Sequence, residues 1–154
     1  MKEYDLILIG TGSGMEIVEV MTQNNHDMKV AVIDKDTPGG ICLTRGCIPS
    51  KLLIYPANLV RTVENTHEFG IHAEIKRIDF EAVMQRMRSI INRDINAIRN
   101  GLWQTKNIDY YTDPAEFIDR VDNDRIIELQ IVGNPLVVVF RRGRAEHHVL
   151  DPVG

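Results

Sequence analysis

The sequence of 154 residues has few of the features that specialised proteins rely on. With only two cysteines it cannot build a disulfide framework, and no second cysteine pair exists to complete a four-ligand zinc site. No apolar run approaches the roughly 20 residues of a membrane span. The N-terminus does not resemble an export signal, because Glu3 and Asp5 interrupt it. The formal net charge of −4 argues against nucleic acid or an anionic membrane as the main partner.

The length and composition of the chain are those of one globular domain. The sequence is 44% hydrophobic and 26% charged, which provides enough apolar material for a core. Two cysteines without an export signal favour a reducing compartment, so we expect a cytoplasmic protein. In that setting a close cysteine pair is expected to be catalytic rather than structural.

Both cysteines lie within residues 39–51, Gly-Gly-Ile-Cys-Leu-Thr-Arg-Gly-Cys-Ile-Pro-Ser-Lys. On a straight α-helix the Cα atoms of residues i and i+5 would be about 8–9 Å apart, whereas a disulfide needs about 4.4–6.8 Å. The backbone must therefore bend between Cys42 and Cys47, and Gly46 permits a bend most easily. A bridge across bent backbone is a candidate for a redox-cycling bond. A pair of inert buried thiols is the alternative.

The first 34 residues follow the pattern of a βαβ dinucleotide-binding unit. The apolar run Tyr4–Ile9 predicts a buried parallel strand that ends at the glycine-rich turn 10–14. Apolar residues then recur with helical spacing over 17–21, and a second apolar run, Val30–Ile33, ends in Asp34. Backbone N–H groups at the turn would face a pyrophosphate, and Asp34 would accept hydrogen bonds from a ribose.

The glycine fingerprint departs from the usual spacing at its third position. Met15 stands there, and Gly14 precedes it by one residue. Because the third glycine allows the helix to pack closely on the strand, we expect this helix to stand off slightly. On its own the glycine pattern indicates nucleotide binding only weakly, since ordinary turns also produce it.

Residues 39–51 resemble the redox-active segment of the class I flavin disulfide oxidoreductases. That family includes the dihydrolipoamide dehydrogenases, glutathione reductases, mycothione reductases and mercuric reductases. Its pattern is Gly-Gly-x-Cys-x-x-x-Gly-Cys-Ile-Pro-Ser-Lys, and every fixed position is met here. The chain is most similar to the N-terminal, FAD-binding part of the dihydrolipoamide dehydrogenases, specifically over residues 4–70, moderately to about 119 and poorly afterwards. The glycine fingerprint upstream strengthens the likeness.

The resemblance implies FAD as the cofactor, with the βαβ unit binding its ADP half and the cysteine segment lying against the flavin. Cys47 would lie nearest the flavin, Cys42 would exchange with the substrate, and Lys51 would stabilise negative charge on the reduced ring. The resemblance makes Cys42 and Cys47 catalytic. It assigns cofactor contacts to Gly10, Gly12, Ser13, Gly14, Asp34, Lys35, Gly40, Ile41, Cys42, Cys47, Lys51 and Ala115.

In full-length members of this family, NAD(P)H reduces the flavin, the flavin reduces the disulfide, and the thiols exchange with a substrate. Dihydrolipoamide oxidation runs in the opposite direction. The implied partner is a small-molecule or protein-bound disulfide or dithiol, and full-length members would form homodimers. We expect no metal site and no nucleic-acid or membrane partner.

Two long helices are predicted beyond the cysteine segment. Pro49 suits the first turn of a helix that follows it, and Pro56 should kink or shorten that helix. Asp79 is the expected N-cap of a long amphipathic helix that ends soon after Gly101. His67 lies between the two helices, and we expect it at the surface rather than in a catalytic role.

The last part of the sequence predicts strands. Residues 107–119 resemble the family's return strand, where Ala115 borders the adenine and Asp113 stands in place of a glycine. Residues 125–132 and 136–141 predict a β-hairpin. The family next returns to its main sheet with a strand that ends in Ala-Thr-Gly, whereas two arginines and a glycine follow the apolar run here.

The expected fold class is α/β, a Rossmann-like FAD-binding βαβ domain with long helices and a small β-meander, shortened relative to the family. The domain would span residues 1–154, with 1–119 family-like and 120–154 divergent. Because no nicotinamide-binding or interface domain is recognisable, we do not expect this chain alone to complete turnover. Two alternatives stay open: a non-enzymatic remnant that binds FAD or another nucleotide, and a small thiol-redox module without flavin.

Overall fold

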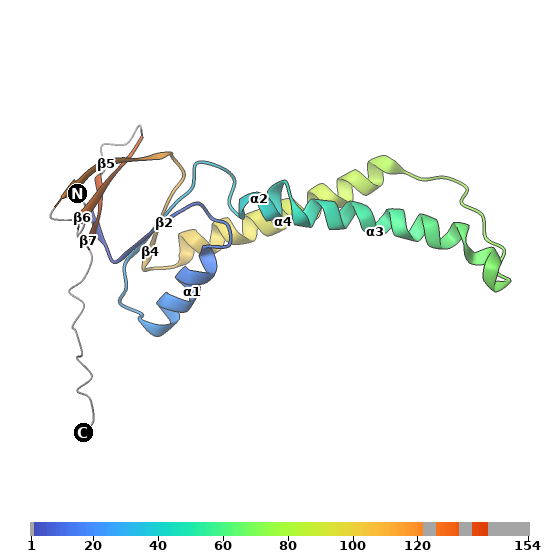
Figure 1. The fold of residues 1–154 in the computed structure, drawn as a ribbon, viewed down its shortest axis with the longest axis horizontal. Coiled ribbons are helices and arrows are strands. Elements are labelled where there is room, and N and C mark those ends of the chain that lie inside the picture. Colours follow the sequence, from blue (N-terminus) through green and yellow to red (C-terminus); the bar gives the residue numbers. More distant parts are fainter. Residues whose placement is uncertain (1, 122–125, 133–136, 142–154) are drawn as a thin grey trace, which may run out of the picture.

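A computed structural model describes residues 2–121, 126–132 and 137–141, and it has an α/β fold (Figure 1). Its parallel sheet contains β2 (Leu6–Ile9), β3 (Val30–Ile33) and β4 (Ile108–Tyr111) in the order β2-β3-β4. Helix α1 (Met15–Asn24) connects the first two strands. All four residues of β3 are buried, as expected for the central strand of a parallel sheet. The predicted βαβ unit is therefore confirmed.

The predicted first strand, Tyr4–Ile9, is in fact two strands. β1 (Lys2–Tyr4) and β2 are separated by a bend at Asp5, whose carboxylate accepts a hydrogen bond from the backbone N–H of Lys29 at 2.8 Å. After this bend the chain leaves one sheet and enters the other. The sequence pattern missed the break because the apolar run continues through it.

β1 belongs to a four-stranded sheet in the order β1-β7-β6-β5. Its other strands are β5 (Ala115–Val121), β6 (Ile126–Ile131) and β7 (Val137–Arg141). β6 pairs antiparallel with both β5 and β7, and β7 pairs in parallel with β1. The predicted hairpin is thus confirmed by the pairing of β6 with β7, while its connecting residues lie outside the described part. The apolar run of the hairpin's second strand lies beside β1 and not in the three-stranded parallel sheet.

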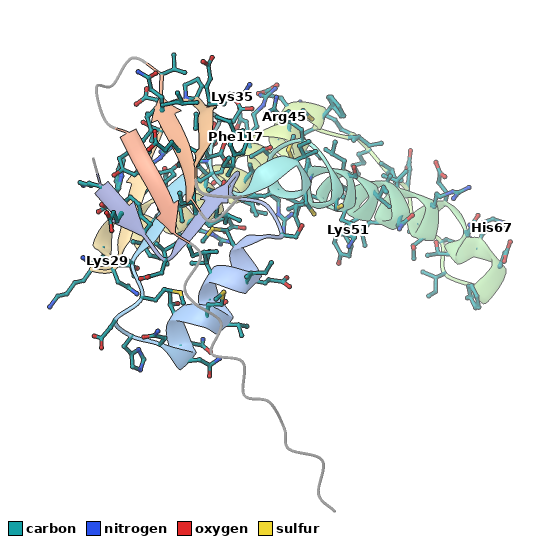
Figure 2. The ribbon with its side chains drawn as sticks, turned by 60° about the vertical axis from the view of Figure 1, so that its left-hand side comes forward. Lys29, Lys35, Arg45, Lys51, His67 and Phe117 are labelled. Carbon is teal, nitrogen blue, oxygen red and sulfur yellow. The ribbon has the colours of Figure 1, made fainter. Side chains whose placement is uncertain are left out.

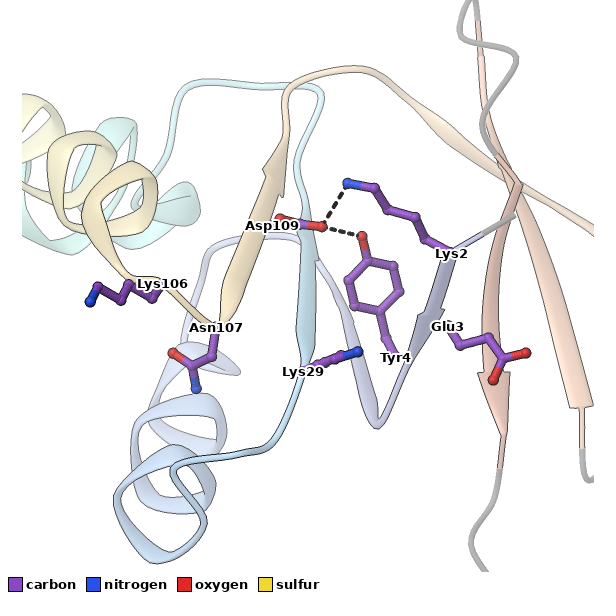
Figure 3. A pocket seen from close by; sticks show the side chains of 7 residues that line it. All are labelled: Lys2, Glu3, Tyr4, Lys29, Lys106, Asn107 and Asp109. Atoms are coloured by element: carbon purple, nitrogen blue, oxygen red, sulfur yellow. Dashed lines mark hydrogen bonds and ion pairs between the residues drawn. The ribbon is translucent and has the colours of Figure 1, made fainter.

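A polar cluster joins the two sheets and lines a cavity between them (Figure 3). The Tyr4 hydroxyl donates a hydrogen bond to Asp109 Oδ2 at 2.5 Å, Lys2 Nζ lies 2.9 Å from the same oxygen, and the Tyr111 hydroxyl lies 2.5 Å from that of Tyr4. The hydrogen bonds from Tyr4 and then Lys2 lower the pKa of Asp109, whereas burial and the Asp109 bond raise the pKa of Tyr4. Asp109 therefore ties β4 to β1 as a charged acceptor.

The remaining helices form an arm that extends away from the sheets (Figure 1). α2 (Gly40–Thr44) is followed by α3 (Cys47–Glu64), a 3₁₀ turn η1 (Thr66–Phe69) and α4 (Phe80–Gln104), and α3 runs beside α4. α3 continues past Pro56, so this proline does not end the helix. Asp79 caps α4 as predicted, since its carboxylate accepts a hydrogen bond from the Ala82 N–H at 3.0 Å.

α4 contributes to two hydrophobic clusters. Near its end, Leu102 packs with Val18 of α1 and with Val30 and Val32 of β3. The middle of the helix forms a second cluster against the segment that holds the cysteines, and its buried and half-buried members are Met87, Ile91, Ile95, Met84, Leu43, Leu52 and Leu53. None of the helices within the described residues is both long and apolar enough to cross a membrane.

Leu102 should be a principal contributor to stability. Its side chain is 4% exposed, so Leu102→Ala should leave a cavity and lower the free energy of unfolding by about 2–5 kcal/mol. Leu59→Ala is the matched control, because Leu59 is also helical but 49% exposed, and it should cost less than about 1 kcal/mol. Urea unfolding followed by circular dichroism would measure both. Equal losses would show that α4 does not anchor the sheet.

Candidate functional site

The glycine-rich turn leads from β2 into α1 and leaves backbone open to a ligand. Gly10 has φ +92°, and a Cβ at this position would meet no atom within 4 Å, so the space above the backbone is free. At Gly14 a Cβ would lie 2.9 Å from Cδ1 of Leu8 in β2. Gly14 therefore makes the close approach usually made by the fingerprint's third glycine. The expected stand-off of α1 is not seen at this contact.

A cavity of about 300 Å³ opens at the carboxyl ends of the parallel strands. In open parallel sheets this is the edge where ligands bind. Four of the predicted contact residues, Gly10, Asp34, Lys35 and Ala115, line the cavity together. Gly10 follows β2, Asp34 and Lys35 follow β3, and Ala115 begins β5. Its other lining residues are Ile9, Ile33, Asp113 and Pro114. The cavity therefore brings a carboxylate and open glycine backbone to one place.

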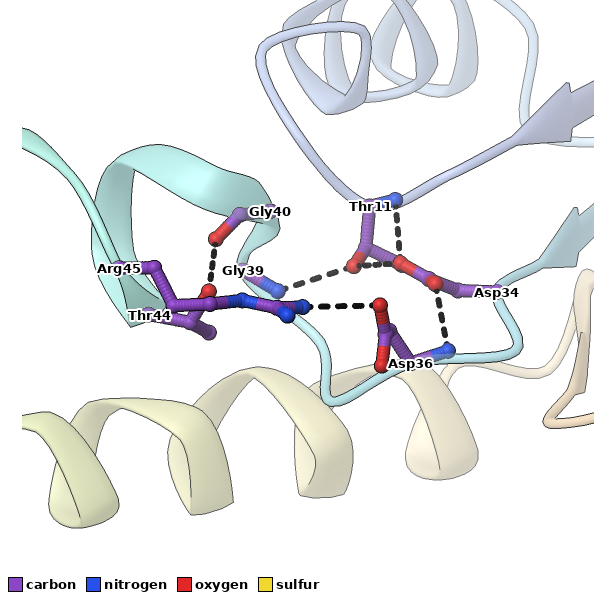
Figure 4. A network of polar contacts seen from close by, with 7 residues as sticks. All are labelled: Thr11, Asp34, Asp36, Gly39, Gly40, Thr44 and Arg45. Atoms are coloured by element: carbon purple, nitrogen blue, oxygen red, sulfur yellow. Dashed lines mark hydrogen bonds and ion pairs between the residues drawn. The ribbon is translucent and has the colours of Figure 1, made fainter.

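The Asp34 carboxylate is held in place from within the protein (Figure 4). Its Oδ2 accepts hydrogen bonds from the backbone N–H of Thr11 at 2.8 Å and from the Thr11 hydroxyl at 2.5 Å. Its Oδ1 accepts a bond from the backbone N–H of Asp36 at 2.9 Å. A carboxylate offers about four acceptor positions, so one remains for a ligand hydroxyl. The orientation of this acid is therefore set before any ligand binds.

The cysteine segment begins directly against the glycine-rich turn. Gly40 has φ +64°, and a Cβ there would lie 2.6 Å from Cα of Gly12. Position 40 therefore requires glycine, because a side chain there would force the two backbones apart, whereas a Cβ at Gly12 would lie 4.0 Å from Cα of Gly40. The predicted fingerprint and the predicted redox segment, 28 residues apart at these positions, thus form one continuous surface.

The helix is interrupted between the two cysteines, as the sequence predicted. Cys42 lies in α2, α3 begins at Cys47, and Gly46 between them has φ −125° and ψ −117°. A Cβ at Gly46 would lie 2.9 Å from the carbonyl oxygen of Ile41 and 3.3 Å from Cα of Cys42. The turn is therefore folded back on Cys42 in a way that a larger residue would disturb.

Both cysteines are exposed free thiols in the structure. The pKa of Cys42 is raised, chiefly because its thiol is hydrogen-bonded to the thiol of Cys47. The positive charge of Lys51, one turn into α3, acts in the opposite direction as a smaller contribution. The thiols thus sit close to each other and accessible to solvent, which is the arrangement that thiol–disulfide exchange requires.

The other predicted contact residues are less closely joined. Ser13 lies exposed at the start of α1, and Ile41 in α2 is 74% exposed. Lys51 is an exposed residue of α3, and His67 lies far along the arm in η1, at the surface as predicted (Figure 2). Neither cysteine lines the cavity that contains Asp34. The residues of this cavity and the segment with the cysteines are connected through the glycine-rich turn instead.

Sequence reasoning overlooked Thr11. The residue is 3% exposed, and its hydroxyl also accepts a hydrogen bond from the backbone N–H of Gly39 at 2.9 Å. The available signal was a hydroxyl residue between the first two glycines of the fingerprint. Sequence reasoning also missed the ion pair between Arg45 and Asp36, at 2.8 Å, which links the residues between the two cysteines to the segment after β3.

The chain is similar in sequence to known dihydrolipoyl dehydrogenases and to a mycothione reductase. No family model matches the chain. It is 35% identical over 138 residues to the dihydrolipoyl dehydrogenase of Chlamydia trachomatis, covering 89% of this chain and 28% of the relative. A dihydrolipoyl dehydrogenase of Bacillus subtilis is 34% identical over 110 residues, or 71% of this chain and 23% of the relative. The mycothione reductase of Mycobacterium tuberculosis is 36% identical over 87 residues, or 56% of this chain and 18% of the relative.

A solved structure shows the same fold. It is the Cu(II) complex of the HOCl-induced flavoprotein disulfide reductase RclA from Escherichia coli, with a TM-score of 0.67 and 24% sequence identity. The match covers 91% of this chain and 27% of that one. The chain therefore spans less than a third of the length of each of these proteins.

Gly40 should be far less tolerant of substitution than Gly70, a glycine with a similar φ. Gly40→Ala adds a clash with the Gly12 backbone to the strain of a positive φ, whereas Gly70, with φ +74°, has nothing within 4 Å of an added Cβ. Gly70→Ala should cost only about 1–2 kcal/mol of backbone strain. Gly40→Ala should cost clearly more, measured as the difference in urea midpoints. Equal losses would mean that the Gly12–Gly40 approach does not constrain the fold.

Proposed function

Because the chain is homologous to the N-terminal region of the dihydrolipoyl dehydrogenases, we propose that it binds FAD and carries a redox-active Cys42–Cys47 pair. The observation that best supports this is the contact between Gly12 and Gly40. It joins a dinucleotide fingerprint to a cysteine pair on one surface. Nucleotide binding alone would not require the second element, and a thiol module without flavin would not require the first.

The residues of the turn and the cavity would hold the ADP half of the cofactor. Free space above the backbone at Gly10 and the N-terminus of α1 favour a pyrophosphate, because the phosphates can approach the turn closely and the helix dipole attracts anions. Asp34 would accept a ribose hydroxyl at its remaining acceptor position, while Lys35 and Ala115 border the adenosine. The proposed set is completed by Gly12, Ser13, Gly14, Gly40, Ile41, Cys42, Cys47 and Lys51. When bound, the flavin would supply a carrier for two electrons.

Cys42 and Cys47 would perform the thiol chemistry in two balanced steps. The Cys42 thiolate attacks a substrate disulfide, forming a mixed disulfide and releasing one substrate thiolate. The Cys47 thiolate then attacks the Cys42 sulfur, closing the bridge and releasing the second. A dithiol substrate would run both steps backwards. Because the pKa of Cys42 is raised above its usual value of 9.0, its thiolate fraction, and with it the rate of the first step, should keep rising as the pH passes 9.

The substrate class and partners belong to the same proposal. Exposed thiols suit a small-molecule or protein-bound disulfide or dithiol. In a longer polypeptide with this region, NAD(P)H would supply or accept the electrons and a homodimer would form. A cytoplasmic location follows from the proposed cycling of the pair in a reducing compartment.

Loading with FAD tests the cofactor assignment. Protein incubated with FAD and then desalted should retain close to one flavin per chain, measured by absorbance after heat extraction. Asp34→Ala should weaken retention because it removes the ribose acceptor. Asp36→Ala is the matched control, since the Asp36 carboxylate pairs with Arg45 rather than facing the cavity. Retention of ADP without flavin would instead support a nucleotide-binding remnant, and retention of neither would refute the proposal.

The two cysteines should behave differently in FAD-loaded protein. A Cys47 thiolate beside the flavin should give a long-wavelength absorbance band, which Cys42→Ser should preserve because the bridge can no longer form. Cys47→Ser should lose the band while leaving Cys42 open to alkylation. Spectra and iodoacetamide rates of both variants measure this. Identical behaviour would contradict the assigned roles.

A further inference from the structure

One buried hydroxyl connects the two halves of the candidate site. The Thr11 side chain donates to Asp34 Oδ2 at 2.5 Å and accepts from the Gly39 N–H at 2.9 Å (Figure 4). Its backbone N–H donates to the same carboxylate oxygen at 2.8 Å. With Thr11 only 3% exposed, water cannot easily replace these bonds. The hydroxyl thus donates to Asp34 on one side of the site and accepts from Gly39 on the other.

We propose that Thr11 is a positioning residue that couples ligand binding in the cavity beside Asp34 to the disulfide equilibrium of Cys42 and Cys47. The proposal rests on the proposed function, because it requires a ligand that engages Asp34. These bonds already exist without a ligand, and a ligand hydroxyl bonded to Oδ1 would reduce the remaining motion of the carboxylate. The Thr11 hydroxyl would pass this added restraint to the Gly39 N–H. No step requires the ligand to touch a cysteine.

The last link is short and leads directly to the cysteines. Gly39 has φ +111° and immediately precedes α2, so the hydrogen bond to Thr11 restrains a turn with unusual backbone angles. Cys42 follows Gly39 by three residues, within the first turn of α2. Restraining this turn holds Cys42 close to Cys47, as the structure shows it. Bridge formation should then lose less conformational freedom, so an occupied cavity favours the disulfide.

A second route between the two halves exists and must be separated from the first. Gly12 contacts Gly40 through backbone alone, and a ligand pyrophosphate near the turn would act on this contact without Thr11. Removing only the Thr11 hydroxyl distinguishes the routes. Thr11→Val keeps the size and branching of the side chain, Thr11→Ser keeps the hydroxyl, and both keep the backbone contact.

ADP is the suitable probe because it has the pyrophosphate, ribose and adenine of the cofactor but no flavin. Wild-type protein is equilibrated in glutathione buffers with and without saturating ADP, then alkylated and resolved by mass. In this assay two cysteine thiols transfer two electrons and two protons to one glutathione disulfide, which yields two glutathione thiols. ADP should shift the equilibrium toward the Cys42–Cys47 disulfide by at least about fivefold, the lower end of typical coupling between sites.

The response to ADP should depend on whether residue 11 keeps its hydroxyl. Thr11→Val should weaken ADP binding about tenfold, as expected for loss of a hydrogen bond to a charged group. At equal ADP occupancy it should also lose most of the shift, whereas Thr11→Ser should retain it. Thr44→Val is the matched control, because the Thr44 hydroxyl donates to the Gly40 carbonyl at 2.8 Å within α2 and does not reach Asp34. It should respond to ADP like the wild type.

Failure of the inference can be told from failure of the proposed function. If wild-type protein binds neither ADP nor FAD, both are refuted. If it binds ADP and the disulfide equilibrium does not move, moves toward the dithiol, or moves equally in Thr11→Val, only the coupling through Thr11 is refuted. Should Thr11→Val not fold, hydrogen exchange of the Gly39 amide in wild-type protein decides. ADP should slow that exchange, and an unchanged rate would refute the coupling.

Discussion

The backbone contact between Gly12 and Gly40 is the constraint on which the site depends. Neither residue has a side chain, so the turn after β2 and the start of α2 meet without an intervening layer. A ligand held by the turn and a thiol held by α2 are therefore separated only by backbone. A single Cβ at Gly40 would require one of the two segments to move. Movement of the turn after β2 would displace part of the cavity lining, and movement of α2 would displace Cys42.

α4 holds the same segment from the opposite side. Leu43 in α2 and Leu52 in α3 pack against its buried residues Met87, Ile91 and Ile95. The same helix also packs on the parallel sheet near its end. One long helix thus connects the sheet that carries the cavity to the turn that carries the thiols. Apolar packing fixes the distance between them, while hydrogen bonds fix the local orientations.

The sequence predicted the features that depend on local chemistry. The Asp79 cap and the break at Gly46 each follow from residues within one or two turns of each other. The βαβ unit follows from the order of apolar runs and glycines along residues 4–34. Two features that depend on distant partners were missed. The bend at Asp5 depends on a bond to Lys29, and the role of Thr11 depends on Asp34 and Gly39. Neither partner can be identified from spacing, because folding alone brings them together.

The cysteine pair combines a rigid support with an open front. Gly46, Leu43 and the Gly39–Gly40 turn are each held by close backbone or apolar contacts, whereas the two thiols are exposed. Disulfide exchange needs a substrate sulfur to approach in line with the bond that breaks, so the thiols cannot be enclosed. It also needs the second thiol to remain within reach of the first, so their spacing cannot vary freely. A break between two helices satisfies both requirements, because the helices fix the spacing and the break leaves the sulfurs uncovered.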